Sequence, residues 1–315
     1  MRISWLTYLD PFVFSGGGEM HDRLLIEVGR RRGHRITISP WLRRRAQRLL
    51  RRAHVARRVP VDWDADLFVL ANIRNHGPRR DRFPQGIVDR ALSTGRAVVL
   101  ADAWVDVCAL DLPCRGNRER CPVTCSRAFA NNLYAAARAA VFVSPMQRTL
   151  IESVIDVPLP STVIYSRPQI DTSLFRQLGH ERDIDVLYVG SINRAKGYDN
   201  LIERFGPDRL TFVGPNYLDE PIQGTWLGPM ANDSLPEIYN RAKTFAHLPR
   251  WTEPMGRTVV EAALCGCDLV LNDRVGVTSY ESQDWREPAR VQTNAELFWS
   301  ELEDALTCIP AGPES

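Results

Sequence analysis

The sharpest chemical pattern in the sequence is a pair of glutamates separated by seven residues. Glu253 lies in a polar segment just before Gly256, and Glu261 lies within the apolar run 259–264. A helix that begins at Gly256 would direct free backbone N–H groups and the positive end of its dipole toward a phosphate. A carboxylate before that helix can accept hydrogen bonds from sugar hydroxyls, and one two turns into it can reach a ribose. A solvated helix face is the alternative for either glutamate, but an unpaired charge within an apolar run is costly.

Two basic residues lie in the loop expected after the first strand of the second half of the chain. The segment from Tyr188 to Gly197 reads YVGSINRAKG and leads into a predicted helix. Arg194 and Lys196 could clamp a diphosphate there, the guanidinium through a bidentate contact and the ammonium as a point charge. Two exposed bases in front of a helix are the alternative interpretation.

Three consecutive glycines, Gly16, Gly17 and Gly18, lie between the first expected strand and the first expected helix. Glycines allow the backbone to approach a ligand closely and leave N–H groups free for an anion. The dinucleotide fingerprint GxGxxG is absent, so this run does not indicate a dinucleotide. A flexible turn is the alternative.

Short apolar strands alternate with helical patterns along the chain. The predicted strands are residues 3–6, 36–39, 67–70, 97–101, 141–144, 163–165, 186–189, 210–213, 244–248 and 269–272. The predicted helices are residues 20–32, 42–56, 84–93, 127–138, 146–155, 197–205, 233–242, 256–264 and 294–307. This alternation predicts an α/β protein with parallel, doubly wound sheets. Ligands of such sheets bind at the carboxyl ends of the strands, so we expect the chemistry in the loops.

The chain is long enough for two domains. Its 315 residues are 44% hydrophobic and 25% charged, values typical of a globular protein, and they exclude the disordered and fibrous classes. The polar segment 166–183 lacks a clear period, and we interpret it as a linker. We therefore predict an N-terminal Rossmann-like domain over 1–165 and a C-terminal one over 184–315 that includes the terminal helix. Two such domains would face a central cleft.

Charge is distributed unevenly between these halves. Residues 1–165 contain 26 arginines against 15 acids, while residues 166–315 contain 14 basic residues against 23 acids. Twelve of the arginines, and no acid, lie between Arg30 and Arg58. Apolar residues after Pro40 recur at helical spacing, so this segment predicts a basic amphipathic helix. An anionic membrane surface or nucleic-acid phosphates would suit it, and a solvated helix in an arginine-rich proteome is the alternative.

Because the sequence shows no export signal, we expect the seven cysteines to lie in a reducing compartment, where metal ligation or burial is favoured over disulfides. No apolar run approaches the length of a membrane span, and we find no signal-peptide pattern, so we expect a cytoplasmic protein, peripheral on the inner face of the membrane if the basic helix binds lipid. Four of the seven cysteines fall within eighteen residues, a density that suits a structural zinc ion, with partly buried free thiols as the alternative. The predicted zinc ligands are Cys108, Cys114, Cys121 and Cys125.

The segment EPMGRTVVEAALCGCDLVLNDRVG resembles the E-x7-E region of retaining, GT-B-fold glycosyltransferases of the glycogen-synthase-like group 1 type. The resemblance extends along the chain, strongly over residues 160–280 and more weakly before 160. GGGEM resembles the glycine loop of that family, VIYSRPQIDTSLF its interdomain segment, and VGSINRAKGYDNLI its phosphate-binding loop. The resemblance implies a GT-B fold with a donor site for a nucleotide diphosphate sugar in the second half of the chain.

The resemblance also implies individual roles. Glu261 would hold the nucleotide ribose, Glu253 would face the donor sugar, and Lys196 with Arg194 would neutralise the departing diphosphate without a metal ion. The remaining donor-binding residues would be Gly16, Gly17, Gly18, Gly190, Gly256, Arg257 and Thr258. Many relatives have a histidine after the fourth strand, where this chain has Ala101 beside Asp102. Asp102 is therefore one acceptor-side candidate, and Arg74 and His76, which follow the third expected strand, are the others.

We thus expect a metal-independent enzyme that transfers a sugar with retention of anomeric configuration. Its acceptor would be a cell-envelope or lipid-linked glycan, and the alternative acceptor is a modified base in DNA. Two other classes stay open: a non-catalytic module that binds nucleotide sugars or nucleic acid, and an epimerase that acts on the free nucleotide sugar. His247, which ends an expected strand near Glu253, could also line the donor site.

Overall fold

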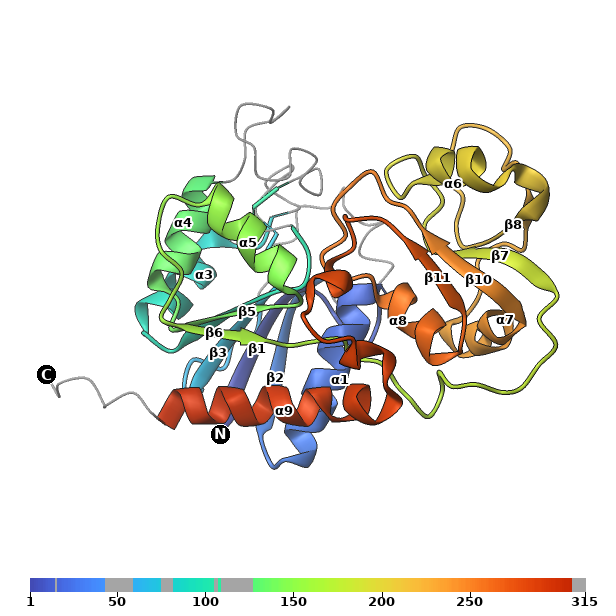
Figure 1. Ribbon diagram of the computed structural model, residues 1–315. Coiled ribbons are helices and arrows are strands. Elements are labelled where there is room, and N and C mark those ends of the chain that lie inside the picture. Colours follow the sequence, from blue (N-terminus) through green and yellow to red (C-terminus); the bar gives the residue numbers. More distant parts are fainter. Residues whose placement is uncertain (15, 43–58, 75–81, 105–106, 109–126, 308–315) are drawn as a thin grey trace, which may run out of the picture. The chain divides into compact units, whose positions relative to one another are not determined.

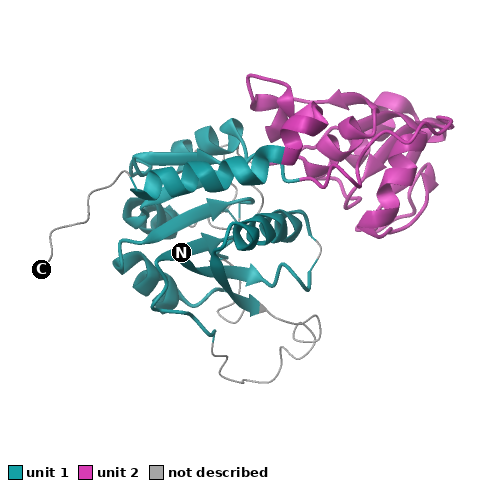
Figure 2. Cartoon of the chain, turned by 90° about the horizontal axis from the view of Figure 1, so that it is seen from below, with its two compact units in different colours: residues 1–169, 293–315 teal, residues 170–292 magenta. Residues whose placement is uncertain are grey.

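The computed structural model describes residues 1–14, 16–42, 59–74, 82–104, 107–108 and 127–307. Its internal contacts divide the chain into two compact units (Figure 2). Unit 1 comprises residues 1–169 together with 293–315, and unit 2 comprises residues 170–292. The chain therefore leaves unit 1 once, builds the whole of unit 2, and returns.

Unit 1 is built on a parallel sheet of six strands in the order β2-β1-β3-β4-β5-β6 (Figure 1). The strands are β1 (Arg2–Leu9), β2 (Arg35–Leu42), β3 (Leu67–Ala71), β4 (Ala97–Ala101), β5 (Ala139–Phe142) and β6 (Thr162–Tyr165). The central strands β3 and β4 are buried along their whole length, which explains their continuous apolar sequences LFVLA and AVVLA. Because β1 pairs with β2 on one side and β3 on the other, strand order reverses beside β1.

Helices cover both faces of this sheet. One face packs against α3 (Gln85–Ser93), α4 (Arg127–Ala136) and α5 (Pro145–Val154). The other face packs against α1 (Gly17–Arg31) and α9 (Pro288–Thr307). On that second face Trp299 of α9 lies against Gly29 of α1, where a Cβ would overlap the indole ring, and its Nε1 donates to the carbonyl of Leu25 at 2.8 Å.

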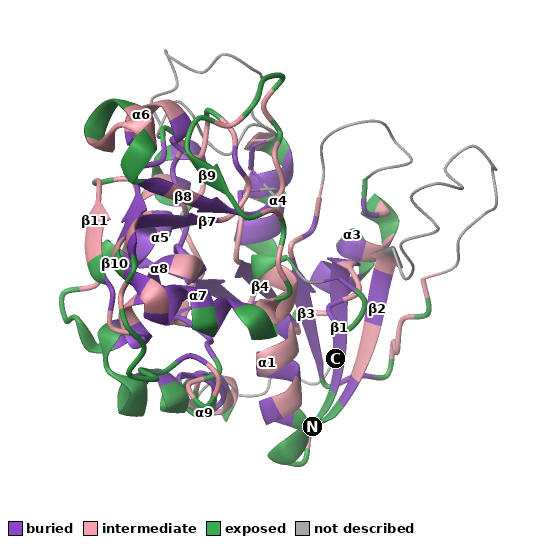
Figure 3. Cartoon of the chain, turned by 90° about the vertical axis from the view of Figure 1, so that its right-hand side faces the viewer, coloured by how far each residue is buried: buried purple, intermediate pink, exposed green. Residues whose placement is uncertain are grey.

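Unit 2 is a second parallel sheet of five strands in the order β11-β10-β7-β8-β9. The strands are β7 (Ile184–Val189), β8 (Leu210–Val213), β9 (Thr225–Trp226), β10 (Ala242–His247) and β11 (Asp268–Leu271). One face packs against α6 (Tyr198–Phe205), and the other against α7 (Leu235–Arg241) and α8 (Arg257–Leu264). Short 3-10 turns are η3 (Pro207–Arg209), η4 (Asn232–Ser234), η5 (Gly276–Ser279) and η6 (Asp284–Arg286). Figure 3 shows β7 and β8 as buried strands and β9 as the exposed edge.

The predicted fold class is confirmed, because both sheets are parallel and flanked by helices in the Rossmann-like manner. Each of the predicted strands is present, and β9 was not predicted because Thr225–Trp226 is too short to show a pattern. The unit boundaries differ from the sequence-based domains. Ile170 and Phe175 of the presumed linker are buried in the core of unit 2, and the terminal helix packs on unit 1 from residue 293 onward.

Several predictions fall on residues that the structure does not describe. These are most of the basic segment (43–58), His76, and three of the four presumed zinc ligands, Cys114, Cys121 and Cys125. Cys108 is described, and it is buried. Within the described ranges we find no cluster of three or more side chains that could hold a metal ion, and no helix long and apolar enough to cross a membrane.

Candidate functional site

Two loops at the carboxyl edge of the sheet and the helix α8 that follows the second loop contain the predicted donor-site residues of unit 2. The loop 190–197 follows β7, and the loop 248–256 follows β10. These strands are neighbours in the sheet, so their loops emerge side by side. Backbone bonds join the loops, because the N–H groups of Arg250 and Trp251 both donate to the carbonyl of Ala195, at 2.9 and 3.1 Å. Residues more than 50 positions apart are thereby held together.

Lys196 and Glu253 form an ion pair across these loops. The Nζ atom of Lys196 donates to Oε2 of Glu253. The Glu253 backbone is fixed on its other side, since its N–H donates to the carbonyl of Arg274 and its own carbonyl accepts from the N–H of Gly276, both at 2.8 Å. The side chains are 31% and 20% exposed, so the pair is reachable from solvent yet largely enclosed.

The electrostatic balance at Glu253 favours the carboxylate. Burial acts to raise the pKa of Glu253, but the positive charge of Lys196 and a contact with His247 outweigh burial and hold this pKa well below its usual range. The site therefore contains a fixed negative charge beside a fixed positive charge at neutral pH. Such a pair can accept hydrogen bonds from hydroxyl groups and at the same time attract a phosphate.

His247 lies beneath this ion pair at the end of β10. Its side chain is 4% exposed, and its Nε2 lies 3.6 Å from the same Glu253 oxygen that Lys196 contacts. Neither ring nitrogen has a hydrogen-bond partner within 3.5 Å among the described residues. The ring stacks on that of Tyr188 from β7, with centroids 5.8 Å apart and planes at 27°, and the Tyr188 hydroxyl donates to the carbonyl of Ser191 at 3.0 Å.

The loop 190–197 has a backbone that requires glycine. Gly197 has φ +92°, and a Cβ there would overlap the carbonyl oxygen of Leu248. Gly190 has φ +145°, and its carbonyl lies so close to Gly214 at the end of β8 that a Cβ on Gly214 would overlap it. The N–H of Lys196 is fixed by the side chain of Asn193 at 2.8 Å. These contacts, rather than the basic residues alone, determine where Lys196 points.

Arg194 has a different environment from the one its sequence suggested. Its guanidinium pairs with Asp199 at 2.5 Å and with Glu220 at 2.7 Å, and its side chain is 57% exposed. Arg250 also contacts Asp199, at 3.1 Å. Two acids therefore already neutralise Arg194, whereas Lys196 has Glu253 beside it at the carboxyl edge.

Glu261 is almost completely buried within α8, at 1% exposure. One of its oxygens accepts from Nε of Arg257 at 2.8 Å, and the other from the hydroxyl of Tyr239 at 3.1 Å. Burial raises the pKa of Glu261, and these partners act against that rise. Gly256 caps α8 with φ +93°, and Thr258 is half-buried in the first turn. The predicted ribose ligand is thus paired inside the unit, one helical turn beyond Arg257.

In unit 1 the glycine run begins helix α1. Gly16 is the N-cap residue, and Gly17 and Gly18 form the first turn. A Cβ on Gly18 would lie 2.6 Å from a carboxylate oxygen of Asp102, which follows β4. The glycine at position 18 therefore lets Asp102 approach the start of the helix, so two separately predicted features lie together.

Arg74 lies at the same carboxyl edge, after β3. Its guanidinium lies over the ring of Tyr8, 5.4 Å from the centroid. The Tyr8 hydroxyl, Nε of Arg74 and Oδ1 of Asn72 are buried atoms without a hydrogen-bond partner among the described residues. Asn72 also adopts a left-handed backbone, with φ +51°. Buried polar atoms are rarely left unpaired, so this group is suited to a polar ligand.

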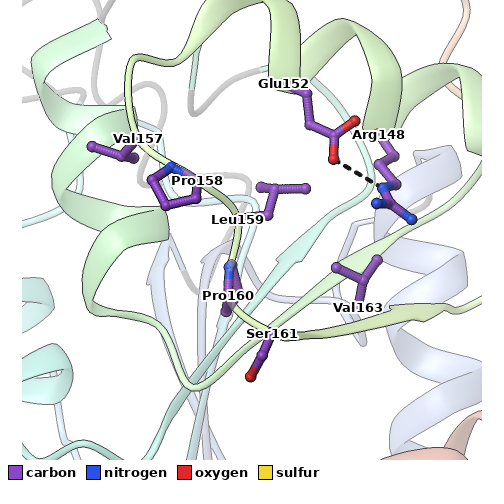
Figure 4. Close-up of a pocket in the computed structure, with 8 residues that line it drawn as sticks. All are labelled: Arg148, Glu152, Val157, Pro158, Leu159, Pro160, Ser161 and Val163. Atoms are coloured by element: carbon purple, nitrogen blue, oxygen red, sulfur yellow. Dashed lines mark hydrogen bonds and ion pairs between the residues drawn. The ribbon is translucent and has the colours of Figure 1, made fainter.

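A separate hollow of about 560 Å³ lies on unit 1 between α5 and the segment that leads to β6 (Figure 4). Arg148 and Glu152 at its rim pair with each other at 3.1 Å, and Val157 to Pro160 form its wall. None of the predicted site residues lines it, so we do not assign it to the candidate site.

Lys196, Glu253 and Glu261, which the sequence predicts as ligands, lie in unit 2, whereas Tyr188 and Tyr8 are not predicted by any sequence pattern. Both tyrosines lie inside strand patterns, where an aromatic residue is expected to pack. The signal that could have identified them is position, since Tyr188 stands two residues before Gly190 and Tyr8 lies near the carboxyl end of the first strand.

Several solved structures have a similar fold. HepE of Anabaena in complex with UDP is 16% identical and has a TM-score of 0.60, with 98% of this chain and 97% of that chain covered. WaaG, a glycosyltransferase involved in lipopolysaccharide biosynthesis, is 15% identical with a TM-score of 0.56, with 96% and 94% covered. Sucrose-phosphate synthase from Thermosynechococcus elongatus is 13% identical with a TM-score of 0.56, with 98% and 97% covered.

No protein-family model matches the sequence, and no curated protein does. At these identities the structural similarity shows the fold alone. The chain has the α/β fold of GT-B glycosyltransferases, with two Rossmann-like units.

Proposed function

We propose that this protein is a glycosyltransferase that takes its sugar from a nucleotide diphosphate sugar. The observation that carries the proposal is the ion pair of Lys196 and Glu253 at the carboxyl edge of unit 2. The ammonium group of Lys196 can bind a diphosphate, and the carboxylate of Glu253, in contact with it, can accept hydrogen bonds from sugar hydroxyls. The GT-B fold, and the UDP and UDP-glucose bound by HepE, support the same donor class.

In this proposal the donor lies across the two loops of unit 2. Lys196 binds the diphosphate, and Glu253 accepts hydrogen bonds from the donor sugar. The N-terminus of α8, with Gly256, Arg257 and Thr258, receives phosphate or sugar oxygens. Glu261 binds the ribose through one of its carboxylate oxygens. For this, the side chain that now donates to that oxygen, Arg257 or Tyr239, must move away.

We propose that transfer retains the anomeric configuration, as the sequence resemblance implies. The bond between the anomeric carbon and the diphosphate oxygen breaks, and an acceptor hydroxyl attacks the same face. The acceptor proton passes to the departing phosphate oxygen. Lys196 offsets the negative charge that develops on this oxygen, and no step of the proposal uses a metal ion. Arg194 would help only if it left Asp199 and Glu220.

The acceptor is proposed to bind unit 1. Asp102 beside Gly18, and the unpaired atoms of Tyr8, Asn72 and Arg74, lie at the carboxyl ends of β1, β3 and β4. A glycan of the cell envelope, or one linked to a lipid, would supply hydroxyl groups for these atoms. The excess of arginine in residues 30–58 suits an anionic membrane surface beside such an acceptor.

The alternative acceptor, a modified base in DNA, would use the same arginines for phosphates. Vesicles of anionic phospholipid and duplex DNA should be compared as binding partners at increasing salt. Binding to vesicles supports the first acceptor class, and DNA binding that weakens steeply with salt supports the second. Sugar conversion without any acceptor would indicate an epimerase instead.

The donor assignment is tested by following nucleotide release from UDP-, GDP- and ADP-sugars. We expect one of them to raise the melting temperature and to be turned over, and we expect Glu253→Gln and Lys196→Ala to abolish turnover. Lys243→Ala is the matched control, because Lys243 is the other lysine of the chain and is exposed on β10. Turnover that survives both site substitutions would remove the assignment. If the protein binds a nucleotide sugar but never cleaves it, it is a binding module and not an enzyme.

A further inference from the structure

His247 is a buried imidazole that lies beside the half-buried carboxylate of Glu253. It lies at the carboxyl end of β10 with its side chain 4% exposed. Its nitrogens have no hydrogen-bond partner within 3.5 Å among the described residues, although a buried polar atom is normally paired. The contact at 3.6 Å from Nε2 to Oε2 of Glu253 is therefore one that a small movement would turn into a hydrogen bond.

The groups that face His247 come from three segments. Tyr188 from β7 stacks on its ring, Glu253 from the loop after β10 lies beside Nε2, and Lys196 from the loop after β7 acts on it through the shared Glu253 oxygen. The Tyr188 hydroxyl is directed to the carbonyl of Ser191 and is uncharged, since burial raises its pKa far above the usual range. Charge at His247 is thus governed by the balance between Lys196 and Glu253.

Binding of a diphosphate changes that balance. In the structure the positive charge of Lys196 compensates Glu253. A diphosphate that contacts Lys196 shares this charge and brings further negative charge to the same enclosed place. Glu253 then needs a second positive partner, and an opposite charge within about 4–6 Å favours the charged form of a titratable group. Histidine is the side chain that ordinarily gains a proton between pH 5 and 8.

We propose that His247 takes up a proton when a nucleoside diphosphate binds, and that the resulting imidazolium replaces Lys196 as the partner of Glu253. The inference rests on the proposed function, because it needs the diphosphate at Lys196. The proton comes from the solvent and adds to the free ring nitrogen, no covalent bond to carbon or phosphorus changes, and the imidazolium donates to Oε2 of Glu253. His247 acts through Glu253, which it positions against the donor sugar while Lys196 is engaged.

The test is isothermal titration calorimetry of the full-length protein with UDP, GDP and ADP, at pH 7.5, in PIPES, HEPES and Tris. These buffers differ in ionisation enthalpy. A plot of the observed binding enthalpy against the ionisation enthalpy of the buffer has a slope equal to the number of protons exchanged. For the nucleotide that binds we expect an uptake of up to about one proton per site, since one imidazole takes up a single proton. When the titration is repeated at other pH values, the proton uptake should be larger at pH 7.0 and smaller at pH 8.5.

His247→Gln should bind the same nucleotide without buffer dependence, and with an affinity that no longer changes between pH 6.5 and 8.5. His180→Gln is the matched control, because His180 is an exposed histidine of unit 2 that pairs with Glu237 at 2.9 Å. It should keep the full proton uptake of the wild-type protein. A purely structural role of His247 would lower affinity without removing the buffer dependence.

Different failures have different meanings. If a nucleotide binds with no buffer dependence, or if the uptake persists in His247→Gln, the inference is wrong and the proposed function stands. If no nucleoside diphosphate binds, the proposed function itself is wrong. If His247→Gln does not fold, NMR of the wild-type protein provides the test. The imidazole proton signal of the buried histidine should move to the position of a charged ring when the protein is saturated with the nucleotide. An unmoved signal would overturn the proposal.

Discussion

Lys196 and Glu253 are joined by an ion pair although 57 positions separate them in the sequence. Each lies on a loop whose backbone is fixed independently, Lys196 by Asn193 and Glu253 by the segment 274–276. The positions of both charged groups are therefore fixed by contacts within unit 2. A site of this kind spends little free energy on ordering its charged groups when the ligand arrives.

Removing one partner of this pair should make stability depend on pH. In Lys196→Met the enclosed Glu253 carboxylate loses its main counter-charge, so its pKa should rise. We expect the free energy of unfolding to fall by about 1–2 kcal/mol at pH 7.5, less than for a fully buried pair, and the loss to shrink as the pH falls and Glu253 takes up a proton. Urea unfolding at pH 4.5 and 7.5 measures it. Lys243→Met should change little at either pH, and an equal loss at both pH values for Lys196→Met would contradict the argument.

Arg194 should matter less for donor binding than Lys196. Its exposed ion pairs with Asp199 and Glu220 are worth little, but they compete with any phosphate. We expect Arg194→Gln to weaken binding of the preferred nucleoside diphosphate by less than about threefold and Lys196→Ala by more than about tenfold. Calorimetry with both variants measures this. Equal losses would show that Arg194 leaves its acidic partners to clamp the diphosphate, as its sequence position suggested.

The two glycines that flank α6 provide a test of the loop geometry. Gly197 and Gly206 both have positive φ, +92° and +74°, but only at Gly197 would a Cβ overlap backbone, whereas nothing lies within 4 Å of one at Gly206. Gly206→Ala should cost about 1–2 kcal/mol of stability from backbone strain alone. Gly197→Ala should cost about 2–4 kcal/mol, and it should also impair turnover because the loop that carries Lys196 must move. Urea unfolding gives the stabilities, and similar costs for both would mean that the loop yields easily.

Asp22 in α1 should make unit 1 less stable as the pH rises. It is 1% exposed, accepts from Nε1 of Trp5 at 3.4 Å, and burial raises its pKa well above the usual range. The folded protein keeps this carboxyl protonated while the unfolded chain ionises it above about pH 4, so stability is lost with rising pH until the raised pKa is reached.

Asp22→Asn removes this ionisation. Its stability relative to the wild-type protein should therefore improve with pH above 4, by up to about 1.4 kcal/mol per pH unit. Thermal unfolding between pH 5 and 8 measures the difference. Glu27→Gln is the control, because Glu27 is a partly exposed acid on the same helix, and it should show no such trend. A parallel trend in both variants would place the effect elsewhere.

Much of the fold could be predicted from the sequence because the strands are continuous apolar runs and the helices have clear periods. Strand β9 could not, since Thr225–Trp226 offers no pattern and exists through its pairing with β8. The position of α9 could not either. Its apolar face shows that it packs, but contacts in the folded protein, such as that of Trp299 with Gly29, determine that it packs on unit 1.

The candidate site was predictable to the extent that it depends on residue type. Lys196 and Glu253 were named as a basic and an acidic ligand, and loop contacts bring them together. Arg194 was named for the same reason, yet it pairs with Asp199 and Glu220, which sequence spacing does not reveal. The position of His247 beneath Glu253 depends on the register of β10 beside β7, a property of the folded sheet.

The return of α9 to unit 1 has a consequence for synthesis on the ribosome. Unit 2 is complete once residue 292 has emerged, but the face of the first sheet that holds Trp5 still lacks Phe298, Trp299 and Leu302. Unit 1 can therefore complete its core only after unit 2 has been synthesised, although most of its residues precede those of unit 2.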